Sequence, residues 1–421
     1  MTEINSIVQW WVTPKLPRQH IYIIPEKSPR SLRKIIKAYS RRWFFHPIKR
    51  RIARYYLLFL QKAFGLTVIG ITGSAGKTTT KDMIASVLSQ VGETRSSYKN
   101  IDPVYSIPTA ILKCRPKTRY LILEMGIEFL SEMDFYLWLA QPSIGVVTPI
   151  YWTHTEFLGS LKDVIKEKGK LVESLSKKGF AILNTDNPQV RKLKRSTKAK
   201  IKWYGLNHGA EIKGKDVGFT KDFKTKFTLE IEDEKQDIYL SLLGQHFVSL
   251  ALAAATVGYI NGIDIKLIKK GLEKVRPLPH RMNLLRLKKG TILIDDSYNA
   301  NPIAVIEAIR LVSNIGKNRR KILVFGEMKE LGRYEERGHR KVGKFAVEKG
   351  IGYIITLGSA TRFTIDEAIK RGIKKNNTFI AKDKKELLIK VRSIIRTKDI
   401  ILVKGSRSLA MEEVVEELIK K

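Results

Sequence analysis

The feature that most constrains this chain is the stretch GITGSAGKTTT at residues 70–80. The apolar run LTVI precedes it and the segment KDMIASVLS follows it, which predicts a strand, a glycine-rich turn and a helix. Backbone N–H groups of such a turn can hold a polyphosphate at a helix N-terminus. The common pattern G-x-x-x-x-G-K-[ST] has glycine where Ile71 stands, so this loop is a variant form. We therefore predict a nucleotide-binding loop, and a plain glycine-rich turn is the alternative.

In this loop Lys77 is expected to reach the β- and γ-phosphates, and the Thr78 hydroxyl is expected to bind Mg²⁺. The predicted nucleotide-binding residues of the turn are Gly73, Ser74, Ala75, Gly76, Lys77, Thr78 and Thr79.

The length, charge and cysteine content of the chain limit its domain number, its partners and its location. Its 421 residues suffice for two or three domains. The formal net charge of +37 favours polyanionic partners, namely nucleic acid, anionic lipid or phosphorylated substrates, although lysine-rich composition alone gives the same excess. A single cysteine, Cys114, excludes a disulfide within the chain. With no signal-peptide pattern and no apolar run near ~20 residues, we expect a cytoplasmic protein.

Residues 1–65 form a basic segment that differs from the rest. Twelve Lys and Arg and no acidic residue lie between Lys27 and Lys62. Apolar residues recur at helical spacing on both sides of Pro47, which predicts two basic amphipathic helices. Such helices suit an anionic membrane surface, and the alternative is that their apolar faces pack on the next domain. The apolar positions are Leu32, Ile35, Ile36, Tyr39 and Trp43, then Ile48, Ile52, Tyr55, Tyr56, Phe59 and Leu60.

From Leu66 onward strands and helices alternate, which indicates an α/β fold with a mostly parallel sheet. The segment TKFTLEIEDEKQDIYLSLL predicts an antiparallel hairpin, and FVSLALAAATVGYI predicts a buried helix. A second α/β block with the strands TILIDD, KILVFG, GYIITLG and DIILVKG begins near two prolines, Pro277 and Pro279. We therefore predict a central ATP-binding domain at 66–278 and a C-terminal Rossmann-like domain at 279–421.

Several polar side chains lie where strands are predicted to end. Lys77, Thr78, Glu124 and His154 all follow such strand ends, and ligands of open α/β sheets bind beyond the carboxyl ends of strands. A hydroxyl, a carboxylate and an imidazole beside a triphosphate make a candidate set for a divalent metal. Taken singly, His154 fits a structural loop histidine and Glu124 fits an ordinary charged strand end.

Eight stretches together resemble the Mur ligase family, most closely its MurF branch. They cover the chain from about residue 66 to its end, and DDSYNANP with GEMKELG is the pair most specific to that branch. The stretches are GITGSAGKTTTKDMI, LEMGIEFLSEMD, GVVTPIYWTHTEFLGSLKDVIKEKGKL, AILNTDNPQV, HRMN, IDDSYNANP, VFGEMKELG and LVKGSRS.

The resemblance implies an ATP-dependent amide ligase of peptidoglycan precursor synthesis. In that family ATP phosphorylates a peptide carboxylate, and an amine then attacks the acyl phosphate. The implied partners are a UDP-N-acetylmuramoyl tripeptide or a similar acidic acceptor, and D-alanyl-D-alanine or a similar amine. We expect a monomer, with peripheral contact with an anionic membrane as an added prediction.

The resemblance also implies residue roles. Lys77, Lys168 and His154 are the expected catalytic residues, and two Mg²⁺ ions are expected on Thr78, Glu124, His154 and Lys168. Lys168 in VIKEKGKL stands where the family has a carbamylated lysine. Around the nucleotide, Asn301 is expected at the adenine, Asp296 at the ribose or phosphates, and Arg281 at the phosphates when the domains close.

Some positions depart from the family pattern. NIDPVYSIP keeps Asn100 and Pro108 but has Ser106 near the place of a glycine, and Lys170 stands where an acidic residue is common. The stretch GQHFVSL keeps only Gly244 and His246 of another family motif.

The basic segment 1–65 is also too short and too basic to match the family's separate UDP-sugar domain. Two other functions are therefore carried forward: a related amide ligase with a different acidic acceptor, and a basic nucleotide-dependent protein that binds nucleic acid or membrane. The absence of a guanine-reading motif and of a stacking module argues against nucleic acid.

Overall fold

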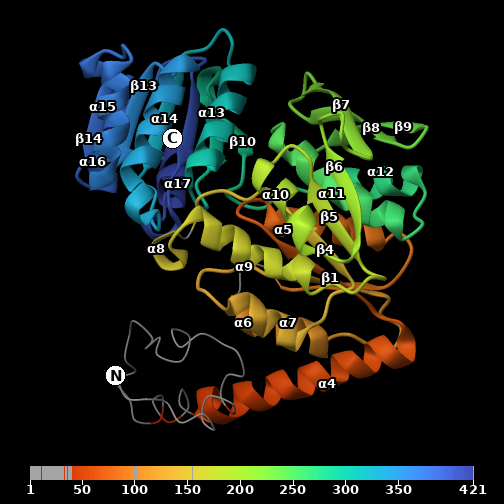
Figure 1. Ribbon diagram of the computed structural model, residues 1–421. Coiled ribbons are helices and arrows are strands. Elements are labelled where there is room, and N and C mark those ends of the chain that lie inside the picture. The colour runs from red at the N-terminus through yellow and green to blue at the C-terminus, as the bar shows by residue number, and fades with distance from the viewer. Residues whose placement is uncertain are drawn as a thin grey trace.

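In the computed structural model the chain forms two α/β units side by side, with one long helix, α4, below the first (Figure 1). The structure describes residues 11, 33, 36, 40–98, 102–153 and 155–420. The predicted fold class is confirmed, because each unit is built on a mostly parallel sheet whose faces are covered by helices.

The central sheet has nine strands in the order β2-β3-β1-β4-β5-β6-β7-β8-β9. Strands β2 to β7 run parallel, whereas β8 and β9 form the predicted antiparallel hairpin. The sequence reading did not single out β2, β6 or β7. The strands are β1 Thr67–Thr72, β2 Thr94–Ser96, β3 Tyr120–Glu124, β4 Ile144–Val147, β5 Phe180–Asn184, β6 Lys200–Gly205, β7 Ile212–Phe219, β8 Thr225–Ile231 and β9 Glu234–Leu240.

Alternate residues of the buried strands feed two separate cores. Ile69 and Ile71 of β1 pack with α5, α11 and α12 on one face, and Val68 packs with α4, α6, α7 and α9 on the other. The predicted buried helix is confirmed as α11. The helices of this unit are α5 Lys77–Leu88, α6 Pro103–Leu112, α7 Glu132–Leu139, α8 Thr155–Leu158, α9 Leu161–Glu173, α10 Pro188–Lys192, η2 Leu193–Ser196, α11 His246–Ile260 and α12 Ile265–Glu273.

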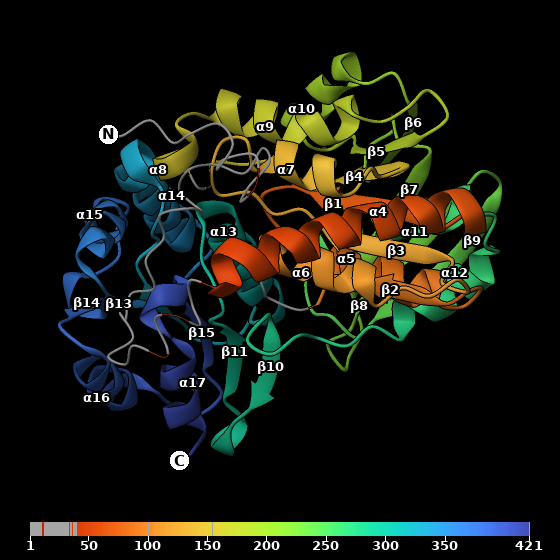
Figure 2. The same cartoon turned by 90° about the horizontal axis from the view of Figure 1, so that it is seen from below.

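Helix α4, His46–Phe64, lies across α6 and α7 (Figure 2). The expected interruption at Pro47 is a π-helical turn, η1 Arg41–Phe45, that runs directly into α4. Proline cannot donate the α-helical hydrogen bond, and the wider turn, with the His46 N–H bonded to the Arg41 carbonyl, accommodates it without a gap. The first of the two predicted helices lies largely outside the described residues.

The two sides of α4 have different environments. Ala53, Leu57 and Leu60 are buried against the central unit. Most of the predicted apolar stripe faces outward instead, with Ile52 56% and Tyr55 67% exposed. Packing of the segment on its neighbour and an exposed apolar face are therefore both present on one helix.

The C-terminal sheet has six strands in the order β10-β11-β15-β12-β13-β14, and only β10 is antiparallel. Four of its strands are those predicted, whereas β10 and β14 were not expected. The strands are β10 Asn283–Arg286, β11 Ile292–Asp296, β12 Lys321–Gly326, β13 Tyr353–Leu357, β14 Thr378–Ala381 and β15 Ile400–Lys404. The helices are η3 Lys288–Gly290, α13 Pro302–Ile315, η4 Gly332–Tyr334, α14 Glu335–Glu348, η5 Ser359–Thr361, α15 Arg362–Lys370, η6 Lys375–Asn377, α16 Lys384–Ile394, η7 Arg407–Leu409 and α17 Glu412–Ile419.

The two units touch through the loop that follows β4. The Trp152 ring stacks on Tyr334 of the C-terminal unit with centroids 5.6 Å apart. Arg337 lies 4.6 Å from the Trp152 ring centroid, and the Thr155 hydroxyl donates to the Leu331 carbonyl at 2.9 Å. These contacts hold the carboxyl ends of the two sheets on either side of one cavity.

The one cysteine of the chain, Cys114, is buried just after α6. Its thiol contacts the Ala110 carbonyl at 3.5 Å, and burial raises the pKa of the thiol to about 12. Across the described residues, no helix is both long enough and apolar enough to cross a bilayer.

Candidate active site

A cavity of about 910 Å³ lies between the two units, beyond the carboxyl ends of β1, β3 and β11. Side chains of the glycine-rich loop line one wall, and residues of the C-terminal unit line the wall that faces it. Most of the predicted site residues line this cavity, namely Ser74, Ala75, Gly76, Lys77, Thr78, Thr79, Glu124, Arg281, Asp296 and Asn301. Gly73 lies at the base of the loop, Lys168 is buried in α9, and His154 lies outside the described residues.

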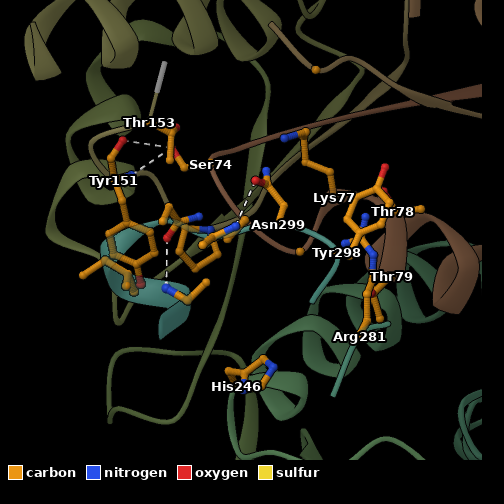
Figure 3. Close-up of a pocket in the computed structure, with 18 of the residues that line it drawn as sticks. Ser74, Lys77, Thr78, Thr79, Tyr151, Thr153, His246, Arg281, Tyr298 and Asn299 are labelled. Atoms are coloured by element: carbon orange, nitrogen blue, oxygen red, sulfur yellow. Dashed lines mark hydrogen bonds between the residues drawn. The ribbon is translucent and has the colours of Figure 1, made fainter. Parts of the chain in front are cut away.

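The loop geometry requires its two glycines. Gly73 has φ +145°, and a Cβ there would overlap Thr148. Gly76 has φ +80° and precedes α5, where a Cβ would come within 2.6 Å of Leu250. Two hydrogen bonds fix the Ser74 hydroxyl, which donates to the Tyr151 carbonyl at 3.0 Å and accepts from the Tyr151 N–H at 2.9 Å (Figure 3). The free N–H groups at the start of α5 therefore face the cavity in a fixed conformation.

Lys77 and Thr78 begin α5 and lie beside Glu124 at the end of β3. The Lys77 ammonium donates to the Gly73 carbonyl at 3.2 Å, and the Thr78 hydroxyl donates to Glu124 Oε1 at 3.1 Å. Burial lowers the pKa of Lys77, and Arg281 across the cavity lowers it further, whereas Glu124 raises it. An anion between Lys77 and Arg281 would relieve this repulsion, so the site is suited to phosphate groups.

The Thr78–Glu124 pair is also what a hard cation needs. A hydroxyl oxygen and a carboxylate oxygen in contact are the donors that Mg²⁺ takes beside phosphate oxygens. Among the described residues no cluster of three or more His, Cys, Asp or Glu could hold a metal without further ligands. The protein thus offers part of a coordination shell, and the remaining positions would fall to phosphates and water.

Lys168 is unusual among the lysines of the chain. Its side chain is fully buried in α9, and its Nζ has no hydrogen-bond partner. Burial, and secondly the charge of Lys77, hold the pKa of Lys168 well below its ordinary value, against the opposing effect of Glu132 and Glu167. Both effects favour the neutral form of the amine, which is the form that reacts with carbon dioxide.

On the opposite wall, Arg281 lies over the Tyr298 ring at 4.3 Å, and Arg407 also lies by that ring, at 5.3 Å. Asn301 is the N-cap of α13, and its Oδ1 accepts from the Ala304 N–H at 2.9 Å. The amide N–H₂ of Asn301 can then donate to a ligand, while one lone pair of its Oδ1 is already in use. Tyr298 and Arg407 were not predicted as site residues.

Asp296 has a partner that the sequence analysis did not assign, Lys404. The Lys404 ammonium forms a very short ion pair with Asp296 Oδ2 and donates to the Asn299 carbonyl at 2.9 Å. Burial raises the pKa of Asp296, and Lys404 lowers it. The signal was present in LVKG, since a lysine at the end of a buried strand needs a counterion, and β15 pairs Lys404 with Asp296 across the sheet.

One residue that departs from the family pattern, Lys170, and one that keeps it, His246, have clear structural places. Lys170 bridges Asp134 and Glu167, each at 2.7 Å, and so ties α9 to α7. His246 lines the cavity at the start of α11, where burial, and secondly Lys404, lower its pKa to about 4. His246 is therefore a neutral imidazole at physiological pH.

Comparison with known proteins follows the same division into two units. The family model described as "Mur ligase middle domain" matches residues 71–258, and "Mur ligase, glutamate ligase domain" matches residues 280–407. UDP-N-acetylmuramoyl-tripeptide–D-alanyl-D-alanine ligase of Escherichia coli strain K12 is 32% identical over 355 residues, which are 83% of this chain and 76% of that protein. The Bacillus subtilis strain 168 protein of the same name is 30% identical over 97% of this chain and 83% of its own length.

Solved structures agree with this. MurF from Acinetobacter baumannii superposes with a TM-score of 0.81 at 24% identity, covering 89% of this chain and 81% of that one. MurF ligase from Thermotoga maritima, solved in complex with ADP, superposes with a TM-score of 0.77 at 23% identity, covering 94% and 87%. Both matches show that this chain shares its fold with the covered parts of those proteins. On the sequence matches and the two family models, this chain belongs to the Mur ligase family of ATP-dependent ligases.

Proposed function

We propose that this chain joins D-alanyl-D-alanine to a UDP-N-acetylmuramoyl tripeptide at the cost of ATP. The observation that carries the proposal is the meeting, on one cavity, of Lys77 and Thr78 from the central unit with Arg281, Asp296 and Asn301 from the C-terminal unit. The relatives that cover most of this chain carry the name of that reaction. A different acidic acceptor is the alternative substrate within the same chemistry.

The reaction proceeds in two steps. A substrate carboxylate oxygen attacks the γ-phosphorus of ATP, the bond to the β–γ bridging oxygen breaks, and ADP leaves. The amine of the second substrate then attacks the acyl carbon, loses a proton, and expels inorganic phosphate. Positioning and charge neutralisation dominate the first step, since phosphoryl transfer needs little acid–base chemistry from the protein.

The residues have distinct tasks in this scheme. The loop N–H groups and Lys77 hold the phosphates from one wall, and Arg281 approaches them from the other. Asn301 donates to the adenine, and Asp296, oriented by Lys404, accepts from the ribose. Thr78 and Glu124 would hold Mg²⁺, which when bound neutralises charge on the phosphates, and His154 is proposed for a second ion.

Lys168 is proposed to act as a carbamate. A neutral buried amine adds carbon dioxide and loses a proton, which replaces a base by an anion with two oxygens. That anion lies within the field of Lys77 and can serve a hard cation. The carbamate should appear as a ¹³C signal when wild-type protein is exchanged into ¹³C-bicarbonate, and it should be missing in Lys168→Ala. An unlabelled wild type would refute the assignment.

The exposed side of α4 supports contact with an anionic membrane. Its apolar residues lie beside basic ones, including Arg51 and Lys62. Such a helix binds in the interfacial plane through apolar burial and charge. The exposed apolar residues are Ile48, Ile52, Tyr55, Leu58, Phe59 and Phe64 of α4, and Phe44 and Phe45 of the preceding η1. The full chain should sediment with phosphatidylglycerol vesicles at low salt. A smaller fraction of the wild type should sediment at high salt, and a smaller fraction of the Ile52→Asp variant should sediment at low salt. Recovery of the wild type in the supernatant at low salt would refute this contact.

The enzymatic test measures ADP, phosphate and product mass with purified protein. ADP should form only when ATP, a UDP-N-acetylmuramoyl tripeptide and D-alanyl-D-alanine are all present. Acceptors that differ in the third peptide residue should be compared, and one ending in 2,6-diaminopimelate should be included. Lys77→Ala should lose ADP formation while keeping the wild-type thermal transition. An equal rate of ADP formation with and without D-alanyl-D-alanine would contradict the proposed substrate.

A further inference from the structure

A second cavity, of about 500 Å³, lies between α4 and α6. Four cationic side chains line it: Arg41 from η1, Lys49 and Arg50 from α4, and Lys113 after α6. Among the described residues that line it there is no Asp or Glu. A cavity walled by cations without a carboxylate is suited to a polyanion.

The cations are close enough to affect one another. Burial lowers the pKa of Lys49, and the charges of Arg41 and Lys113 lower it further. The imidazole of His46, on the same wall, has its pKa lowered to about 4 by burial and then by Arg50, Arg41 and Lys49. A bound anion would remove this repulsion, so the cluster gains most from a ligand that carries more than one negative charge.

Contacts hold three of these side chains in place: Lys49, Arg50 and Lys113. Lys49 donates to the Thr109 hydroxyl at 2.8 Å, and Lys113 lies over the Tyr98 ring at 5.5 Å. Arg50 is only 5% exposed, and its guanidinium lies 5.9 Å from the Tyr105 ring centroid. The cavity is therefore built before any ligand arrives, and Tyr98 and Tyr105 give it aromatic walls on which a base can stack.

This cavity adjoins the catalytic one. Ser106 of α6 lines both. Asp102, the N-cap of α6, lines the catalytic cavity, and its charge raises the pKa of Arg50 in the second cavity. A substrate with phosphates in the second cavity could thus reach across α6 and place a peptide carboxylate in the first.

We propose that the cavity between α4 and α6 binds the diphosphate of the acceptor substrate. The proposal rests on the function proposed above, because that acceptor carries a nucleotide diphosphate at one end and the reacting carboxylate at the other. In this proposal, η1 and α4 supply one wall of a phosphate-binding site for the ligase. The phosphate of a lipid headgroup is the other source of negative charge that such a cavity could bind, and the experiment separates the two.

The test uses the full chain with charge reversals in the cavity. Lys49→Glu and Lys113→Glu should each raise the KM for the UDP-linked acceptor roughly 10-fold or more, since charged hydrogen bonds of this kind change affinity by that order. The KM for ATP should stay within about 2-fold of the wild type. Lys266→Glu is the matched control, because it makes the same charge change on an exposed residue of α12 that lines neither cavity, and it should leave both constants unchanged.

A binding experiment without turnover keeps this inference separate from the proposed reaction. Calorimetric titration with UDP should show binding to the wild type and to Lys266→Glu, and loss of binding in Lys49→Glu and Lys113→Glu. Equal behaviour of all three variants would overturn the site, even if the enzyme joins the two peptides. Loss of binding to phosphatidylglycerol vesicles in Lys49→Glu and Lys113→Glu, with UDP binding retained in both, would also overturn it, because the cavity would then serve lipid headgroups.

Discussion

At the residue scale, Lys168 combines a cost to stability with the role proposed for it in the reaction. A buried amine without a hydrogen-bond partner destabilises the folded state by about 1–3 kcal/mol. We predict that Lys168→Met raises the thermal unfolding temperature in buffer free of carbon dioxide, while it abolishes ligation. A lower unfolding temperature in Lys168→Met would show that the amine has a stabilising contact.

The difference in stability between the wild type and Lys168→Met should depend on pH, because the pKa of Lys168 differs between the folded and unfolded states. The folded-state pKa of Lys168 lies below its ordinary value of 10.5, so the unfolded chain binds more protons than the folded one below that pH. Wild-type stability should therefore fall as pH decreases from 10 toward 7, relative to Lys168→Met. Thermal unfolding of both proteins across that range measures the gap, which should widen toward neutral pH.

The Asp296–Lys404 pair should behave as a coupled unit. Removing one partner of a buried ion pair leaves an uncompensated charge and costs about 3–5 kcal/mol. We predict that Lys404→Met and Asp296→Asn each lower the free energy of unfolding. Their double variant should lose less than the sum by at least about 1 kcal/mol, measured by urea unfolding. Additive losses would mean that the two side chains act independently.

At the scale of elements, α4 has one side that stabilises the fold and one that does not. Leu57 is 1% exposed beneath the helix, whereas Ile52 is 56% exposed. Leu57→Ala should lower the free energy of unfolding by about 2–5 kcal/mol. Ile52→Ala should change it by no more than about 0.5 kcal/mol. Comparable losses from the two variants in urea unfolding would place Ile52 against another part of the protein.

The sequence predicted elements well where hydrophobic periodicity was strong and failed where tertiary pairing decides. The buried runs of β1, β3 and β5 and the apolar α11 are evident from the chain alone. Strand β6 is half-buried and β10 has no fully buried residue, so neither carries an apolar run. Their strand conformation comes from pairing with β5 and β11.

For the site, motif matching found the residues of the loop and of the strand ends, because those positions are set by local geometry. It did not find Lys404 or Tyr298, whose roles depend on which strand lies beside which. The pairing of β15 with β11 is a fact of topology and brings together residues 108 apart in the chain. The cavity between α4 and α6 was also beyond the sequence, since it depends on how one helix lies on another.

At the scale of the whole molecule, the contact between Trp152 and Tyr334 holds the two units together at one side of the cavity. An aromatic pair contributes about 0.5–1.5 kcal/mol beyond its buried area, and the guanidinium of Arg337 adds about 0.5–1 kcal/mol. Trp152→Ala should therefore shift the molecule toward more open forms, seen as a larger radius of gyration in X-ray scattering without nucleotide.

Tyr334→Phe is the matched control for that experiment, because it keeps the stacked ring and removes only the hydroxyl. Its radius of gyration should equal that of the wild type, while Tyr334→Ala should resemble Trp152→Ala. Identical scattering from all four proteins would show that the two units are held together by other contacts.

The burial of Cys114 has a practical consequence for watching such motion. A thiol with a pKa of about 12 has almost no thiolate at neutral pH, and burial keeps reagents away from it. The unmodified chain is therefore expected not to react with maleimide dyes. Cysteines introduced at exposed positions of the two units, such as His208→Cys and Lys374→Cys, would be the only sites labelled. A donor and an acceptor dye there would report the opening and closing of single molecules during turnover.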